Sequence, residues 1–132
     1  TFRILRAKSL GKYKAFRKGL EQLAAEGVGQ ILKNEARGDA SPVMAAVGPM
    51  QFEVMQARME FEYNVETVTE PIPYSVARRP DAESAPELGR QRGVEIFTRQ
   101  DGELIALFGD KWKLAFIEKE HPELTMETLV AD

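Results

Sequence analysis

The chain has 132 residues, of which 43% are hydrophobic and 30% are charged, and its formal net charge is −3. This composition excludes a wholly disordered polypeptide and allows one compact domain or two small subdomains with a hydrophobic core. It contains no cysteine, which excludes disulfides, thiolate catalysis and cysteine-based zinc sites and suits a reducing compartment. No apolar run approaches the roughly 20 residues of a membrane span, and no signal peptide is recognisable. We therefore expect a cytoplasmic protein without a membrane partner.

The first half of the chain predicts the order strand, helix, strand, strand, helix, strand. Loose alternation over 2–9 indicates a strand, and apolar residues then recur at helical spacing from Tyr13 to Leu23 and stop at Gly27. Pro49 opens the second helix, because proline is tolerated in the first helical turn. The predicted strands are 2–9, 28–34, 43–48 and 64–70, and the predicted helices are 10–27 and 49–63. This order is the split βαββαβ pattern of a ferredoxin-like α+β sandwich, with four antiparallel strands and both helices on one face.

The second half of the chain predicts a smaller and degenerate copy of the same element order. Four prolines between 71 and 86 mark a boundary, which assigns 1–70 to the ferredoxin-like subdomain and 71–132 to a smaller α/β subdomain packed on the first. Asp101 and Gly102 predict the turn of a hairpin, and Asp110 predicts a helix N-cap. The predicted elements are strand 74–78, helix 86–92, hairpin 94–109, helix 111–121 and strand 124–131.

The predicted helix 49–63 is apolar on two sides. At about 100° per residue, Phe52, Met55 and Met59 share one side, and a second set of apolar residues lies roughly opposite. A lone surface helix needs only one such stripe, so the second stripe predicts packing against another body, in this chain or in a part missing from it. The candidate residues for this interdomain packing are Met50, Val54 and Phe61.

Basic residues are concentrated at the start of the chain, where seven of them and no acidic residue precede Glu21. This asymmetry is typical of a nucleic-acid footprint or of a solvated strand edge and outer helix face, and both interpretations stay open. If the apolar side of the first helix is buried, Lys14 and Lys18 project into solvent together. These two are our first candidate RNA contacts, flanked by Lys12 and by Arg17, which can instead pair with Glu21. A second set, for which surface solubility is the favoured explanation, is Arg78, Arg79, Arg90 and Arg92.

The sequence shows no catalytic or metal-binding constellation. Its single histidine, His121, lies at a predicted helix end, where a polar or cationic ring suits the helix dipole. Neither G-x-x-x-x-G-K-[ST] nor G-x-G-x-x-G occurs, so no phosphate-cradling loop is predicted. Trp112 and Phe116 are expected in the core, and their helix can equally pack on the first half. We therefore expect a binding or coupling module without a catalytic, cofactor or metal site of its own.

Two stretches of the first half carry a family resemblance. "FRILRAKSLGKYKAFRKGLEQLAAEGVGQIL" followed by "VMAAVGPMQFEVMQARMEFEYNVE" resembles the carboxy-terminal domain of the class II peptide-chain release factors, the release factor three family of bacterial translational GTPases. The motifs are "KGLEQLAAEGVGQI", "AVGPMQFEV" and "RMEFEYNVE". The helix is more distantly similar to the third domain of elongation factor G, from which it departs at Ala57, where the acidic residue is lacking. The second half is similar only in length, element order and its strand-like "YSVARRP" opening.

The resemblance implies a function in translation termination. A factor of this kind binds GTP on the ribosome and promotes the departure of class I release factors after peptide release. Its GTPase and β-barrel domains, with GTP and magnesium, would precede this chain, which starts abruptly at Thr1 and reads as a fragment of a longer protein. The implied partners are rRNA and ribosomal proteins, those missing domains, and class I release factors indirectly, with the chain itself acting as a monomer and not as an enzyme.

An alternative function comes from the fold class alone. Ferredoxin-like domains often pair their sheets or hold a small molecule between subunits, so a ligand-sensing or oligomerising module is the second hypothesis. Gel filtration separates the two, because a stable dimer with a buried sheet edge counts heavily against the ribosome-contacting monomer.

Overall fold

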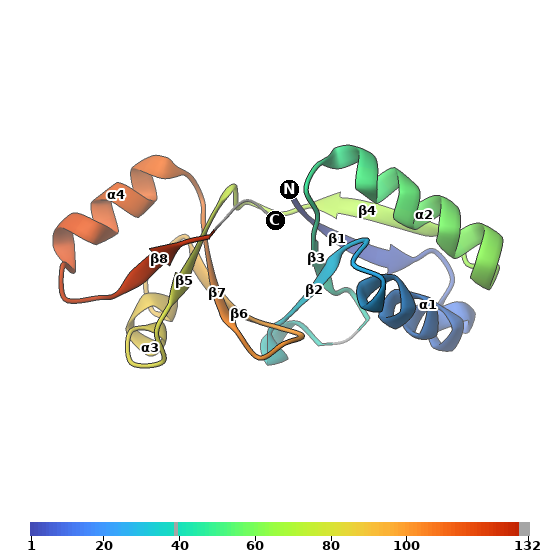
Figure 1. The fold of residues 1–132 in the computed structure, drawn as a ribbon, viewed down its shortest axis with the longest axis horizontal. Helices are drawn as coiled ribbons and strands as arrows, with labels where there is room; N and C mark the ends of the chain where they lie inside the picture. The colour runs from blue at the N-terminus through green and yellow to red at the C-terminus, as the bar shows by residue number, and fades with distance from the viewer. Residues whose placement is uncertain (39, 130–132) are drawn as a thin grey trace. The chain divides into compact units, whose positions relative to one another are not determined.

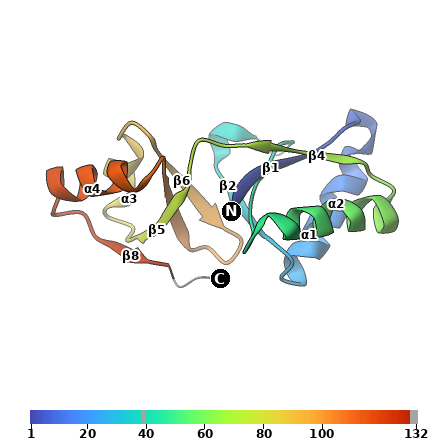
Figure 2. The same cartoon turned by 90° about the horizontal axis from the view of Figure 1, so that it is seen from above.

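The computed structural model describes residues 1–38 and 40–129. It comprises two compact units, Thr1–Ile72 and Pro73–Asp132. Each unit combines a four-stranded antiparallel sheet with two α-helices (Figures 1 and 2). The division falls two residues beyond the boundary predicted from the prolines.

The first unit has the predicted element order. Its strands are β1 (Phe2–Ala7), β2 (Gln30–Lys33), β3 (Val43–Ala45) and β4 (Thr67–Pro71), its helices are α1 (Tyr13–Ala25) and α2 (Pro49–Tyr63), and short 3₁₀ turns lie at Leu10–Lys12 and Glu35–Arg37. The strand order is β4-β1-β3-β2, and Arg3 pairs with Met44 on one side and with Pro71 on the other. This is the ferredoxin-like α+β fold, as the sequence predicts.

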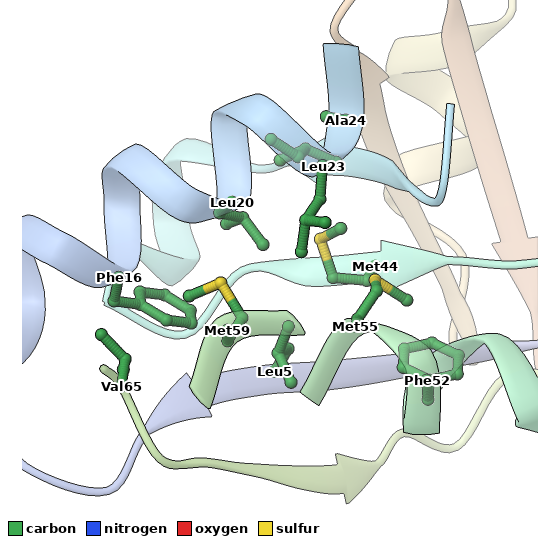
Figure 3. Packing of buried hydrophobic residues seen from close by; sticks show 11 residues of the cluster. Leu5, Phe16, Leu20, Leu23, Ala24, Met44, Phe52, Met55, Met59 and Val65 are labelled. Atoms are coloured by element: carbon green, nitrogen blue, oxygen red, sulfur yellow. The ribbon is translucent and has the colours of Figure 1, made fainter. Parts of the chain in front are cut away.

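Both helices of the first unit cover the same face of its sheet. Leu5, Ile31 and Met44 share that face, because strand side chains alternate and the register places these residues together. They form one buried cluster with the apolar sides of α1 and α2 (Figure 3). The helical residues labelled there are Phe16, Leu20, Leu23, Ala24, Phe52, Met55 and Met59.

Two residues in the left-handed backbone conformation end the helices of the first unit. Gly27 follows α1 with a φ of 78°, and Asn64 caps α2 with a φ of 55°. Glycine and asparagine adopt this conformation at low cost, which turns the chain back toward the sheet. Pro49 is the first residue of α2, where its missing N–H is not needed.

The helices α1 and α2 lie so close that a glycine is required at their contact. A Cβ on Gly19 would lie 2.7 Å from Met59 Sδ and 2.8 Å from Tyr63 Cδ2. Glycine in a helix interior costs about 1 kcal/mol relative to alanine. The close approach therefore explains why α1 keeps this residue at its centre.

The second unit repeats the fold of the first with shorter helices. Its elements are β5 (Val76–Pro80), α3 (Ala85–Gly89), β6 (Val94–Arg99), β7 (Leu104–Phe108), α4 (Lys111–Glu120) and β8 (Met126–Thr128). The strand order is β6-β7-β5-β8. When strands are numbered within each unit, both units have the order 4-1-3-2, so the repeat predicted from element order extends to topology. The end of the predicted strand 124–131 lies outside the described residues.

Local signals in the second unit act as predicted. Asp110 accepts a hydrogen bond from the Lys113 backbone N–H at 2.8 Å and so caps α4. Gly102, with a φ of 88°, closes a three-residue hairpin loop between the paired residues Arg99 and Glu103. The Arg99 guanidinium lowers the pKa of Asp101 in this loop to about 2.

The prediction that Trp112 and Phe116 lie in the core is wrong. Their side chains are 84% and 56% exposed. The buried side of α4 is instead formed by Leu114 and Ile117, which pack with Leu88, Val94, Ala106 and Phe108. At about 100° per residue, Trp112 and Phe116 lie on the side of α4 roughly opposite Leu114 and Ile117, so only one of the two pairs can face the sheet.

Candidate nucleic-acid interface

The basic face predicted on the first helix is present in the structure. Lys14 and Lys18 lie one turn apart on α1 and are exposed, because Phe16, Leu20 and Leu23 hold the opposite side against the sheet. Neither lysine forms an ion pair with a described residue. Lys12 ends the 3₁₀ turn that leads into α1 and is also exposed. The three ammonium groups are therefore available to an external anion.

Arg17 differs from its neighbours on α1. Its Nε lies 3.5 Å from Glu21 Oε1, one turn further along the helix. This is the exposed ion pair that the sequence left as an alternative to a phosphate contact. A surface pair of this kind is worth little in water and yields readily to a phosphate. Arg17 therefore stays a candidate contact on this face, beside Lys12, Lys14 and Lys18.

The basic candidates of the second unit are dispersed. Arg78 and Arg79 are consecutive on β5, so their side chains leave opposite faces of the sheet. Arg78 donates to the Ala77 carbonyl at 2.8 Å. Arg90, at the end of α3, pairs with Glu87 at 2.8 Å, and Arg92 lies exposed in the following turn. No shared surface comparable to that of α1 results.

Arg79 is held by carboxylates of its own unit. Its guanidinium lies 2.8 Å from Glu127 and 3.8 Å from Glu103. The hydrogen bond with Glu127 is the main cause that raises the pKa of Arg79. A phosphate would have to displace these acids, which makes Arg79 a poor RNA contact.

The second apolar side of α2 is exposed, as the helical phase predicts. Met50, Val54 and Phe61 are 74%, 43% and 92% exposed, whereas Phe52, Met55 and Met59 are at most 2% exposed. These three apolar side chains lie on one outer face of the helix. A partner that covered them would gain free energy, because it would remove apolar surface from water.

A network of charges around Arg58 includes one contact that had no visible signal in the sequence. Arg58 on α2 donates to Glu26 at the end of α1, at 2.7 Å and 3.1 Å, and also to Glu62 one turn along α2. The hydrogen bond from Arg58 is the largest cause that lowers the pKa of Glu26 to about 2. Arg58 and Glu26 lie 32 residues apart, so only the folded packing of α1 against α2 brings them together.

The described residues contain no cluster of three or more His, Cys, Asp or Glu side chains suited to a metal ion. Each helix in this part of the chain is too short or too polar to cross a bilayer. His121 follows α4, and its Nδ1 lies 3.7 Å from Glu123.

Comparison with known proteins places the chain in a family. Residues 1–118 match the family described as Class II release factor RF3, C-terminal domain. The chain belongs to this family. The resemblance seen in the sequence motifs is confirmed, and the match reaches well into the second unit, which those motifs did not cover.

Individual relatives carry the same designation. The chain is 38% identical over 130 residues to Peptide chain release factor 3 of Synechococcus elongatus, which covers 97% of this chain and 23% of the relative. The proteins of the same name from Trichodesmium erythraeum and Symbiobacterium thermophilum are 39% and 38% identical, over 95% and 93% of this chain and 23% and 24% of their own length. The chain thus spans about a quarter of the length of these relatives.

Proposed function

We propose that this chain is the ribosome-contacting, carboxy-terminal part of a release factor that acts in translation termination. The observation that carries the proposal is the exposed basic face of α1, in a chain whose relatives are named peptide chain release factors. Lysines without protein partners attract RNA phosphates and release condensed counterions on binding. The ribosome, with its rRNA and ribosomal proteins, is the partner that this chemistry fits.

In this proposal the chain is a coupling module between the GTPase domain and the ribosome, and it catalyses no reaction itself. GTP and magnesium belong to a GTPase domain elsewhere in the longer factor, and the chain transmits its state to the ribosome so that a class I release factor departs. It acts in the cytoplasm as a monomer. The exposed side of α2, with Met50, Val54 and Phe61, packs against the GTPase or β-barrel domain of the same factor.

A double substitution on α1 tests the ribosome contact. We expect Lys14→Ala with Lys18→Ala, in the full-length factor, to weaken ribosome binding and to reduce its salt dependence. The log–log slope should fall by about 0.7–0.9 for each phosphate that the variant no longer neutralises. The measurement is a binding isotherm on purified ribosomes at several salt concentrations.

The matched control removes two exposed lysines elsewhere. Lys111→Ala with Lys119→Ala on α4 changes the net charge by the same amount and should leave affinity and slope close to those of the parent. Equal affinity and slope for the parent and the α1 variant would show that the α1 face is only a solvated surface.

The alternative function, an oligomerising or ligand-sensing ferredoxin-like module, draws on the exposed side of α2. Apolar residues on an outer face can equally serve a second copy of the chain. Sedimentation equilibrium of the 132-residue chain distinguishes the two. A dimer that dissociates on Phe61→Ser would favour this alternative over the ribosome-contacting monomer.

A further inference from the structure

A polar notch lies in the first unit, between α2 and the start of β4. Its volume is about 310 Å³, at the lower end of the roughly 300–1,000 Å³ of small-molecule sites. All of the described lining residues except one alanine carry polar or charged side chains, so a ligand that suits the notch is polar. The lining residues are Lys8, Gln56, Ala57, Glu60, Glu66 and Thr67.

Thr67 forms the inner wall of the notch. It is 8% exposed, whereas Glu60 and Glu66 lie exposed at the rim. Its Oγ1 is buried and has no hydrogen-bond partner among the described residues. A buried hydroxyl without a partner costs free energy, because it has lost its hydrogen bonds to water. A donor in the notch can restore the missing bond after rotation of Thr67 about χ1, which needs no movement of the backbone.

Two further acceptors line the notch without a donor. The Gln56 side chain donates from Nε2 to the Thr67 carbonyl at 3.0 Å, and its Oε1 accepts no hydrogen bond from a described residue. The Glu60 carboxylate forms no ion pair with a described residue. The notch therefore offers a carboxylate, an amide oxygen and a hydroxyl, and a ligand that suits all three is rich in N–H donors.

The charge of the notch favours a cation over an anion. Lys8 Nζ lies 3.6 Å from Glu66 Oε2, and this pair carries no net charge. Glu60 then adds one negative charge to the described lining residues. A phosphate group would meet two carboxylates against one ammonium group and would be repelled.

Among cations, the guanidinium of arginine matches these acceptors best. It carries five N–H donors in one plane together with its positive charge, so it can donate to a carboxylate, an amide oxygen and a hydroxyl at the same time. The ammonium of lysine holds its donors on a single nitrogen, and a metal ion brings no donor.

We propose that this notch binds the guanidinium of an arginine side chain, which donates to Glu60, to Gln56 Oε1 and to Thr67 Oγ1. The arginine belongs to the protein body that covers the outer side of α2. Ala57 lines the notch and lies two helical turns after Met50, on the same side of α2, so the notch opens beside the exposed apolar residues. The inference rests on the packing of α2 in the proposed function and adds the chemistry that the covering surface presents.

An NMR titration of the 132-residue chain tests the notch in the absence of that partner. The probe is N-acetyl-arginine N-methylamide at low salt, and the comparison is the citrulline derivative, which keeps the shape and lacks the charge. The arginine probe should bind with a Kd of about 1–10 mM, as expected for a single side chain. Amide signals of Gln56, Glu60 and Thr67 should move in ¹⁵N spectra. The citrulline probe should bind at least about tenfold more weakly.

Protein variants locate the binding. Glu60→Gln should weaken it by up to about fivefold, and Thr67→Val should weaken it about two- to tenfold, as expected for one hydrogen bond. Thr67→Val also removes the unpaired buried hydroxyl, so its urea midpoint by circular dichroism should equal or exceed that of the parent. A threonine with a purely structural role would give the reverse, a lower midpoint and unchanged binding. Glu53→Gln, an exposed carboxylate of α2 outside the notch, is the matched control and should change neither.

Several outcomes would overturn the proposal. The arginine probe would give no saturable shift, the citrulline probe would bind as tightly, or the Glu60 and Thr67 variants would bind like the parent. Displacement of the probe by magnesium chloride at equal ionic strength, with shifts of the same amides, would identify a metal site instead. Phe61→Ser, which alters the outer side of α2, should leave probe binding unchanged, so failure of the notch and failure of the packing proposed for α2 are read independently.

Discussion

Glu26 and Arg58 show how single residues tie the first unit together. The guanidinium of Arg58 donates to both carboxylate oxygens of Glu26, a bidentate geometry that fixes direction as well as distance. The contact joins the end of α1 to the middle of α2. It also makes the pKa of the Glu26 carboxyl differ between the folded and the unfolded chain.

The Glu26 carboxylate predicts a pH dependence of stability. Its pKa in the folded chain, about 2, lies below the ordinary value of 4.5. Its contribution to stability is therefore present above the unfolded pKa and is lost as the pH falls toward 2. We expect Glu26→Gln to lower the urea midpoint at neutral pH and to reduce the loss of stability between pH 4.5 and 2.

The measurement is urea unfolding followed by circular dichroism at a series of pH values. Glu118→Gln, an exposed carboxylate on α4, serves as the control and should keep the parent's pH profile. A Glu26→Gln variant that loses stability with falling pH as steeply as the parent contradicts the assignment.

At the scale of residues, sequence reasoning succeeds where a residue acts locally. Asp110 and Gly102 act through hydrogen bonds to near neighbours, and Pro49 acts through its fixed φ and its missing N–H. Their positions in a cap, a hairpin loop and a first helical turn therefore follow from residue type. The Arg58 network depends on packing between two helices, which spacing along the chain does not reveal. At Trp112 the residue type is misleading, since a large aromatic side chain suggests burial and this one is exposed to water.

At the scale of elements, the contact between α1 and α2 sets a steric limit at Gly19. A methyl group there would meet the fully buried Met59 and the ring of Tyr63. Overpacking of this kind costs about 1–3 kcal/mol, whereas the gain in helix propensity is only about 1 kcal/mol. We expect Gly19→Ala to destabilise the chain by up to about 2 kcal/mol in urea unfolding.

A second helical glycine provides the comparison. A Cβ on Gly89 in α3 would lie 3.4 Å from Ile96 Cγ1, an ordinary contact distance. Gly89→Ala should therefore be neutral or more stable by up to about 1 kcal/mol. If Gly19→Ala stabilises the chain as well, the two helices do not approach as closely as the Gly19 distances indicate.

Most elements were predictable because apolar spacing and terminal signals agree. The period of about 3.6 residues on α1 and the stop at Gly27 point to the same helix. The two-sided pattern of α2 was also readable, since burial of Phe52, Met55 and Met59 leaves Met50, Val54 and Phe61 outside. Spacing does not say what covers that outer side.

At the scale of the whole molecule, each unit has a core made from its own residues. The cluster of the first unit extends from Leu5 to Val65, and that of the second from Leu88 to Ile117. The last strand of each unit pairs with the first strand of the same unit, β4 with β1 and β8 with β5. Because each cluster is made from residues of one unit, we expect the two units to fold separately from each other.

We expect residues 1–72 to fold without the second unit. A chain of this size has a small core, so a stability of only a few kcal/mol is expected. The checks are a cooperative urea transition by circular dichroism and dispersed amide signals in ¹⁵N spectra. A fragment that ends at residue 63 lacks β4, leaves one side of β1 unpaired and should not fold. An unfolded 1–72 fragment contradicts the prediction.

The repeated topology of the two units leaves little local signal in the sequence. The two halves share element order without sharing motifs, and five-residue α3 and three-residue β8 give weak periodic signals. The common strand order of the two sheets arises from hydrogen bonding between strands distant in sequence, and this pairing leaves no local trace in composition.

The exposure of Trp112 has a consequence for spectroscopy. It is the single tryptophan of the chain, and its indole is already surrounded by water in the folded state. Its emission should therefore change little in wavelength when the chain unfolds, so a fluorescence melt would miss the transition that circular dichroism records. The same indole should shift to shorter wavelength when another molecule covers α4, which makes it a built-in optical reporter of docking on that helix.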